Sequence, residues 1–203
     1  MKLIVKPQVS ALLTYAGVAI SSAGIFLAAG ARTDLGLVCL IAAAVCDVFD
    51  GTFARRFERT DFEKRFGIQI DSLADVVNFV ALPAVLLTRL MAGSPLAVPL
   101  IIFYAGCGIT RLAVYNAEAE ADAPKGYFRG VPIVYIALVL PVAYLAQLRL
   151  QGAAALLVVA LPVVALALLY VLDIRVRRPG RAGYACILLL AVALSAGVLH
   201  AGV

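Results

Sequence analysis

The chain has 203 residues, and hydrophobic residues make up 64% of them. Its mean hydropathy of +1.04 excludes an ordinary soluble enzyme and predicts a single membrane domain over residues 1–203. Lysine and arginine (17) outnumber aspartate and glutamate (12). Membrane topology accounts for this excess, so we expect no nucleic-acid partner.

Seven apolar segments are long enough to cross a membrane, which takes about 20 residues in a helix. Short polar segments separate them, so we expect an all-α integral membrane protein. The expected helices cover 8–29, 35–57, 67–92, 96–117, 131–148, 151–173 and 182–202.

The distribution of positive charge predicts the orientation, because lysine and arginine concentrate on the cytoplasmic side of membrane proteins. If the N-terminus is cytoplasmic, all but three of the 17 lysines and arginines fall on that side. The exceptions are Arg32, Arg89 and Arg149. The charged segments 55–66 and 118–130 should therefore face the cytoplasm.

Four aspartates form two pairs near this cytoplasmic side. Asp47 and Asp50 are three residues apart, and Asp71 and Asp75 are four apart, so each pair shares one face of a helix. Carboxylates held together at a membrane repel one another and lose hydration, and a divalent cation removes this penalty. Oxygen ligands suit Mg²⁺ or Mn²⁺. The alternative, solvated helix ends, would leave these charges without partners.

The residues around the aspartates also follow a pattern. The first pair continues as Asp47-x-x-Asp50-Gly51-x-x-Ala54-Arg55, and the second is Gly67-x-x-x-Asp71-x-x-x-Asp75. Together these strings resemble the signature of the CDP-alcohol phosphatidyltransferase family. The segment between them is longer than is usual in that family, which suggests a longer cytoplasmic loop.

The resemblance implies a fold and a set of roles. The fold is a six-helix core, here with a seventh C-terminal helix, and the family is often homodimeric. The four aspartates would hold Mg²⁺ or Mn²⁺, two ions in all, and Asp75 would also accept a proton as the catalytic base. The residues expected to contact the CDP-lipid are Gly51, Ala54, Arg55, Gly67 and Thr14.

Three further strings are similar to phosphatidylserine synthases within this family. They are DSLAD (71–75) followed by Phe79 and Pro83, RLAVYN (111–116) and YFRGVP (127–132). This similarity implies transfer of a phosphatidyl group from CDP-diacylglycerol to L-serine, with CMP as the product. The residues expected to bind the acceptor are Arg111, Asn116 and Arg129. Three residues depart from the usual pattern, namely Asn78, Val80 and Val114.

Two other functions stay open from the sequence. One is a sister transferase whose acceptor is glycerol phosphate, inositol phosphate or choline. The other is a divalent-cation transporter, which would need polar groups across the bilayer, whereas the clustered acids all lie at one end. The transferase fits better, and we expect its active site to face the cytoplasm from a bacterial or archaeal inner membrane, in contact with membrane lipids.

Overall fold

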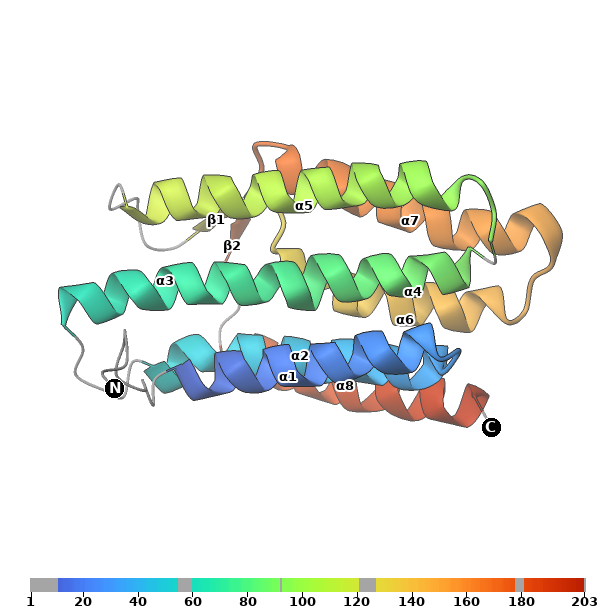
Figure 1. Cartoon of the computed structure of the whole chain (residues 1–203), viewed down its shortest axis with the longest axis horizontal. Helices are drawn as coiled ribbons and strands as arrows, with labels where there is room; N and C mark the ends of the chain where they lie inside the picture. Colours follow the sequence, from blue (N-terminus) through green and yellow to red (C-terminus); the bar gives the residue numbers. More distant parts are fainter. Residues whose placement is uncertain (1–10, 55–59, 92, 121–126, 178–180, 203) are drawn as a thin grey trace, which may run out of the picture.

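The computed structural model describes residues 11–54, 60–91, 93–120, 127–177 and 181–202. Within these ranges the chain forms a bundle of seven helical rods, one of which joins two helices end to end (Figure 1). The helices are α1 (Leu12–Ala29), α2 (Thr33–Ala54), the continuous α3 (Asp61–Val76) and α4 (Leu82–Leu90), α5 (Ala97–Glu120), α6 (Ile136–Gln147), α7 (Gly152–Val171) and α8 (Arg181–Ala201). The prediction of an all-α protein with seven rods is confirmed.

Four of the described rods are long and apolar enough to cross a membrane. They are Leu12–Ala29, Asp61–Leu90, Ala97–Glu118 and Gly152–Val171. Two shorter apolar helices, Ile133–Gln147 and Ala185–Ala201, lie alongside them. The chain is therefore a multi-pass integral membrane protein.

The third rod begins earlier than the sequence analysis predicted. Thr60 and Glu63 form a capping box: the Thr60 hydroxyl accepts from the Glu63 backbone N–H, and the Glu63 carboxylate accepts from the Thr60 backbone N–H at 2.8 Å. This arrangement satisfies backbone donors at the start of α3. The prediction of a loop over 55–66 is thus wrong for 61–66, where charged residues occupy the first turns of a helix. Residues 55–59 lie outside the described part of the chain.

The third rod changes its winding just beyond the second aspartate pair. A π-helical turn over Val77–Ala81 joins α3 to α4. Pro83 has no backbone N–H and so cannot bond to the carbonyl of Phe79, four residues earlier. The buried hydroxyl of Tyr104, on α5, donates to this carbonyl instead. Pro83 is therefore accommodated by a contact that ties α5 to the third rod.

A short strand pair connects the segment before α6 with the segment after α7. Strands β1 (Tyr127–Arg129) and β2 (Arg175–Arg177) are antiparallel, with Phe128 opposite Val176. Gly130 follows with a φ of +72°, and a Cβ there would lie 2.7 Å from the carbonyl oxygen of Tyr170. Only glycine fits this position without strain. The sequence analysis did not predict this strand pair.

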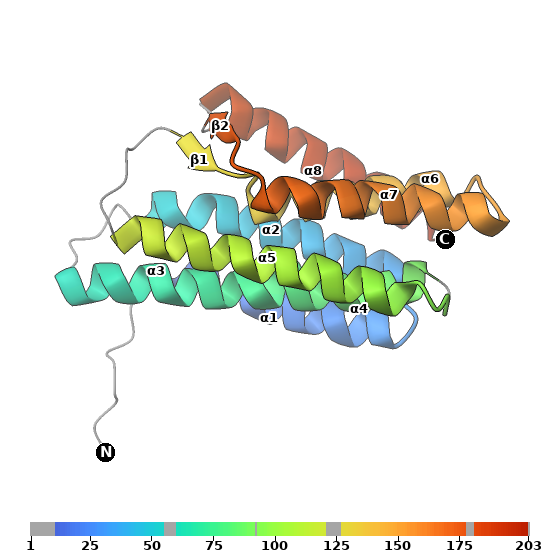
Figure 2. The same ribbon diagram turned by 90° about the horizontal axis from the view of Figure 1, so that it is seen from above.

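Helix α8 packs on the side of the bundle formed by α2 and α6 (Figures 1 and 2). Ala191 and Leu194 of α8 form a buried apolar cluster with Ile41 of α2. The other face of α8 is exposed, with Leu189 at 71%. The seventh helix is thus attached to the bundle along one stripe.

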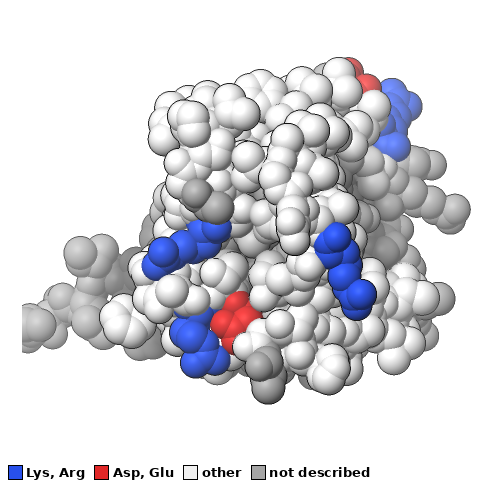
Figure 3. All heavy atoms as spheres, turned by 90° about the vertical axis from the view of Figure 1, so that its right-hand side faces the viewer, with Lys and Arg blue, Asp and Glu red and all other residues white. Residues whose placement is uncertain are grey.

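The start of α1 and the end of α8 lie toward opposite ends of the bundle (Figure 1). The end of the bundle at which α8 finishes also holds the turns from α1 to α2 and from α6 to α7. Its charged side chains are few, some of them in contact with side chains of opposite charge, on a largely uncharged surface (Figure 3).

Candidate active site

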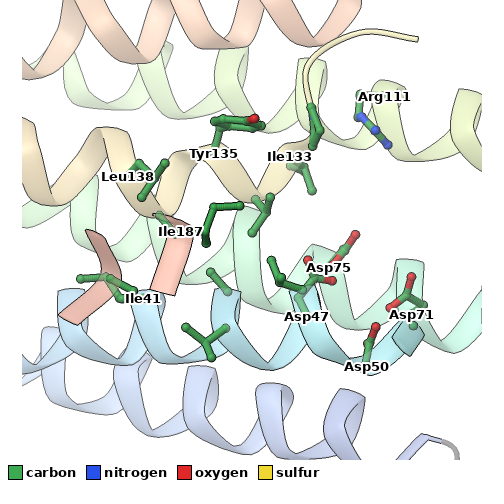
Figure 4. Close-up of a pocket in the computed structure, with 18 of the residues that line it drawn as sticks. Ile41, Asp47, Asp50, Asp71, Asp75, Arg111, Ile133, Tyr135, Leu138 and Ile187 are labelled. Carbon is green, nitrogen blue, oxygen red and sulfur yellow. The ribbon is translucent and has the colours of Figure 1, made fainter. Parts of the chain in front are cut away.

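A cavity of about 300 Å³ opens among α2, α3, α5, α8 and the segment that leads into α6. Four carboxylates point into one part of it (Figure 4). They are the four aspartates of the sequence pattern: Asp47, Asp50, Asp71 and Asp75. The rest of the lining is mainly apolar.

The antiparallel course of α2 and α3 explains how two distant pairs meet. Helix α2 ends and α3 begins at the same end of the bundle (Figure 1). The aspartate of each pair that lies further from this end therefore faces its counterpart on the other helix. Asp47 interacts with Asp75, and Asp50 interacts with Asp71. Spacings of three and four residues correspond to rises of about 4.5 and 6 Å, so both contacts can form together.

Three of the carboxylates have the geometry of a cation site. Asp47, Asp71 and Asp75 each offer an oxygen, and these oxygens all lie within 4.8 Å of one another. The Oδ1 atom of Asp75 is buried and has no hydrogen-bond partner among the residues that the structure describes. A buried, unpaired carboxylate oxygen is costly, and a hard divalent cation takes oxygen ligands of this kind. The residues present therefore fit Mg²⁺ or Mn²⁺.

Asp50 has an additional partner that the other three lack in the described structure. The hydroxyl of Thr14, which is buried on α1, donates to Asp50 Oδ2 at 3.0 Å. This bond joins α1 to the aspartate cluster, where Asp50 also interacts with Asp71. Thr14 thus reaches the site through Asp50.

Arg111 brings the positive charge that faces the aspartates. It is 7% exposed on α5 and lines the same cavity. Its Nε donates to the carbonyl of Val131 at 3.2 Å, and its guanidinium lies 5.2 Å from the ring centre of Tyr115. A planar guanidinium held on one edge can still bind an anion through its other N–H groups. Arg111 is therefore positioned for anion binding rather than for surface contact with lipid.

The structure places the other expected acceptor residues differently. Asn116 does not line the cavity: its Oδ1 accepts from Ser72 at 2.6 Å, and its Nδ2 donates to Gln69 at 3.5 Å. Both partners belong to α3, so Asn116 fixes α5 against the helix that carries Asp71. Arg129 lies in β1, and its side chain is outside the described part of the structure.

The residues expected to contact the CDP-lipid are also distributed unevenly. Gly51 lines the cavity beside Asp50. Gly67 lies one turn before Asp71 on α3, and Ala54 is the last residue of α2. Arg55 is outside the described residues.

The three departures from the phosphatidylserine synthase pattern lie away from the cavity. Val114 is 46% exposed on the outer face of α5. Asn78 and Val80 are buried in the π-helical turn, where Val80 packs near Gly108. These substitutions therefore leave the cavity lining unchanged.

The sequence analysis missed several residues of the cavity. Tyr115 lies one helical turn beyond Arg111, a spacing that could have signalled a shared face. Tyr135 and Leu138 approach from the segment entering α6, and Ile187 from α8 (Figure 4). No sequence signal distinguishes these apolar residues from others that face lipid.

Comparison with known proteins agrees with this geometry. The family profile described as CDP-alcohol phosphatidyltransferase matches residues 8–171. The chain belongs to this family. The match includes all four aspartates and Arg111, and it ends before α8 begins.

Curated relatives carry more specific names. The CDP-diacylglycerol–serine O-phosphatidyltransferase of Mycobacterium tuberculosis (strain ATCC 25618 / H37Rv) is 38% identical over 101 residues, which cover 47% of this chain and 34% of the relative. The protein of the same name from Saccharomyces cerevisiae is 35% identical over 105 residues, 48% of this chain and 37% of the relative. The archaetidylserine synthase of Methanothermobacter thermautotrophicus is 29% identical over 143 residues, which cover 68% of this chain and 58% of the relative. The chain thus spans about a third of the length of the mycobacterial and yeast proteins.

Proposed function

We propose that this family member transfers the phosphatidyl group of CDP-diacylglycerol to L-serine and releases CMP. The observation that carries the proposal is the composition of one cavity. Its carboxylates, a buried arginine and a long apolar lining suit the diphosphate, the acceptor and the lipid of such a reaction. The names of the curated relatives support serine as the acceptor.

The reaction needs a base, because an aliphatic hydroxyl is a weak nucleophile at neutral pH. Asp75 has a buried oxygen without a hydrogen-bond partner in the described structure. It accepts the proton of the serine hydroxyl as the hydroxyl oxygen bonds to the lipid-side phosphorus. The bond from that phosphorus to the bridging oxygen breaks, and the bridging oxygen leaves with CMP.

Mg²⁺ or Mn²⁺, when bound, would neutralise the diphosphate and stabilise the negative charge that develops on CMP. Asp47, Asp71 and Asp75 would supply the first group of ligands. Asp50, oriented by Thr14, extends the cluster, so that four carboxylates are available to two ions.

Arg111 binds an anionic group of a substrate, and the carboxylate of serine is the group we assign to it. Its Nε is held by the Val131 carbonyl, so the guanidinium plane is fixed while other N–H donors face the cavity. An acceptor with its own phosphate would call for further cations near Asp71 and Asp75. The described lining offers Arg111 alone for this purpose.

We place the site on the cytoplasmic face, which agrees with the distribution of lysine and arginine in the sequence, and we expect a homodimer. Single cysteines introduced in 61–66 and at 118–120, in a background without the native cysteines, should resist an impermeant thiol reagent added outside intact cells. Ready labelling from outside would overturn this orientation.

Release of CMP from CDP-diacylglycerol tests the reaction itself. Purified protein with Mg²⁺ or Mn²⁺ should release CMP when L-serine is supplied. Parallel reactions with glycerol 3-phosphate, inositol phosphate and choline identify a sister activity. If one of these drives release and serine does not, the acceptor assignment is wrong while the phosphatidyl transfer stands.

A further inference from the structure

The cavity extends well beyond the carboxylates along one stripe of α2. Its lining on this helix runs from Gly51 through Val48 and Ala44 to Ile41. Ten residues of helix correspond to about 15 Å. The carboxylates lie at one end of this stripe, and the remainder is apolar.

The opposite wall of this apolar part comes from α6 and α8. Leu138 of α6 and Ile187 of α8 face the stripe (Figure 4). Ala191, one turn further along α8, also lines the cavity and packs against Ile41. The cavity is therefore closed on this side by the helix that follows the family match.

The walls of this extension suit a hydrocarbon chain. An apolar slot offers no hydrogen bonds to a nucleotide or an amino acid, whereas burial of methylene groups is favourable there. A lipid whose phosphate lies at the aspartates has its acyl chains attached within reach of the slot. The size of the side chains on α8 then limits how much chain the slot accepts.

We propose that α8 forms a selectivity wall for an acyl chain of the lipid substrate, with Ile187 as the residue that sets the width of the slot along its course. This inference rests on the proposed function, because it assumes a CDP-lipid at the aspartates. The family match covers the six rods formed by α1–α7, and the wall comes from α8, which lies outside the match.

The test measures kcat/KM for CDP-diacylglycerols with short and with long saturated chains and compares the ratio in each variant. The ratio is taken within one protein preparation, so loss of active protein cancels. Ile187→Trp should lower the long-to-short ratio by about tenfold or more, since apolar pockets discriminate single methylene groups by 10- to 200-fold. Ile187→Ala should leave long chains accepted at least as well as in the wild type.

Leu189 supplies the matched control. It lies two residues from Ile187 on the same helix but is 71% exposed, so Leu189→Trp and Leu189→Ala should leave the ratio unchanged. A photoreactive side chain at 187 should also crosslink to a labelled CDP-lipid, and excess unlabelled CDP-lipid should compete. The same group at 189 should show no such competition.

The outcomes separate two failures. If the wild type releases CMP but both Ile187 variants keep the wild-type ratio, α8 has no part in chain selection and this inference is wrong. If no CDP-lipid of either chain length releases CMP with any alcohol, the proposed function fails and takes this inference with it.

Discussion

Charged side chains occur at both ends of the bundle, but their surroundings differ. At the end that holds the turn from α1 to α2, Arg89 Nε donates to the carbonyl of Ala28 at 2.9 Å, and Arg89 also bonds to the carbonyl of Ala29. Arg32 pairs with Asp34 at 3.2 Å. At the other end, four carboxylates share a cavity with Arg111.

This difference distinguishes charged side chains that stabilise the fold from the clustered carboxylates to which we assign the chemistry. Arg89 adds hydrogen bonds to carbonyls in the last turn of α1, where the helix has few donors of its own to offer. The aspartates instead face one another, which costs free energy until a cation binds. In a membrane protein, a cluster of this kind is a functional-site hypothesis, and the proposed function rests on it.

The largest effect should follow from removing one ligand of the cation site. Asp47→Asn and Asp71→Asn each lose a charged oxygen from the group of three, so we expect no measurable CMP release and weaker binding of Mn²⁺. Electron paramagnetic resonance titration of free Mn²⁺ measures the binding without turnover. Wild-type turnover in either variant at limiting Mg²⁺ or Mn²⁺ would show that the cluster holds no metal.

Replacing Asp75, the proposed base, should slow the reaction even when the site is saturated with metal. Asp75→Asn cannot accept a proton, so even at saturating Mn²⁺ the rate should fall by about 10²–10⁴. Binding of CDP-diacylglycerol, measured by equilibrium methods, should weaken only modestly. A loss of a few-fold in rate would mean that another group takes the proton.

A smaller effect should appear at the cation that faces the cluster. Arg111→Ala removes the guanidinium from the cavity, and we expect the KM for serine to rise by roughly tenfold, the change that corresponds to about 1.4 kcal/mol. Arg111→Lys keeps the charge but not the planar donor group, so it should recover only part of the loss. An unchanged KM for serine in Arg111→Ala would remove Arg111 from the acceptor site.

The smallest effect on turnover should come from the opposite end. Arg89→Ala removes two hydrogen bonds to carbonyls of α1 and should lower the thermal unfolding temperature by about 2–4 °C, the shift expected for 1 kcal/mol in a chain of this size. Its kcat should match the wild type. Arg32→Ala breaks an exposed ion pair and should shift the temperature less. Loss of activity in Arg89→Ala without loss of stability would contradict the division between the two ends.

The sequence by itself determined the number of helical rods, because each is a long apolar segment bounded by polar residues. It also determined that Asp47 and Asp50 share a face, as do Asp71 and Asp75, since helical periodicity fixes this locally. The start of α3 could also have been predicted from the sequence. Thr60 and Glu63 have capping-box spacing, but the charges that follow them resemble a loop.

Only the tertiary structure decided which faces look inward. Periodicity alone does not say which side of α5 faces the interior. Packing places Arg111 and Tyr115 in the cavity lining and leaves Val114 exposed. The position of Asn116 was likewise decided by packing, because Asn116 bonds to Ser72 on α3. The wall formed by α8 has the same origin. Its leucines, isoleucine and alanines are similarly apolar on every side, and hydrophobicity alone does not tell a face that packs on protein from one that meets lipid.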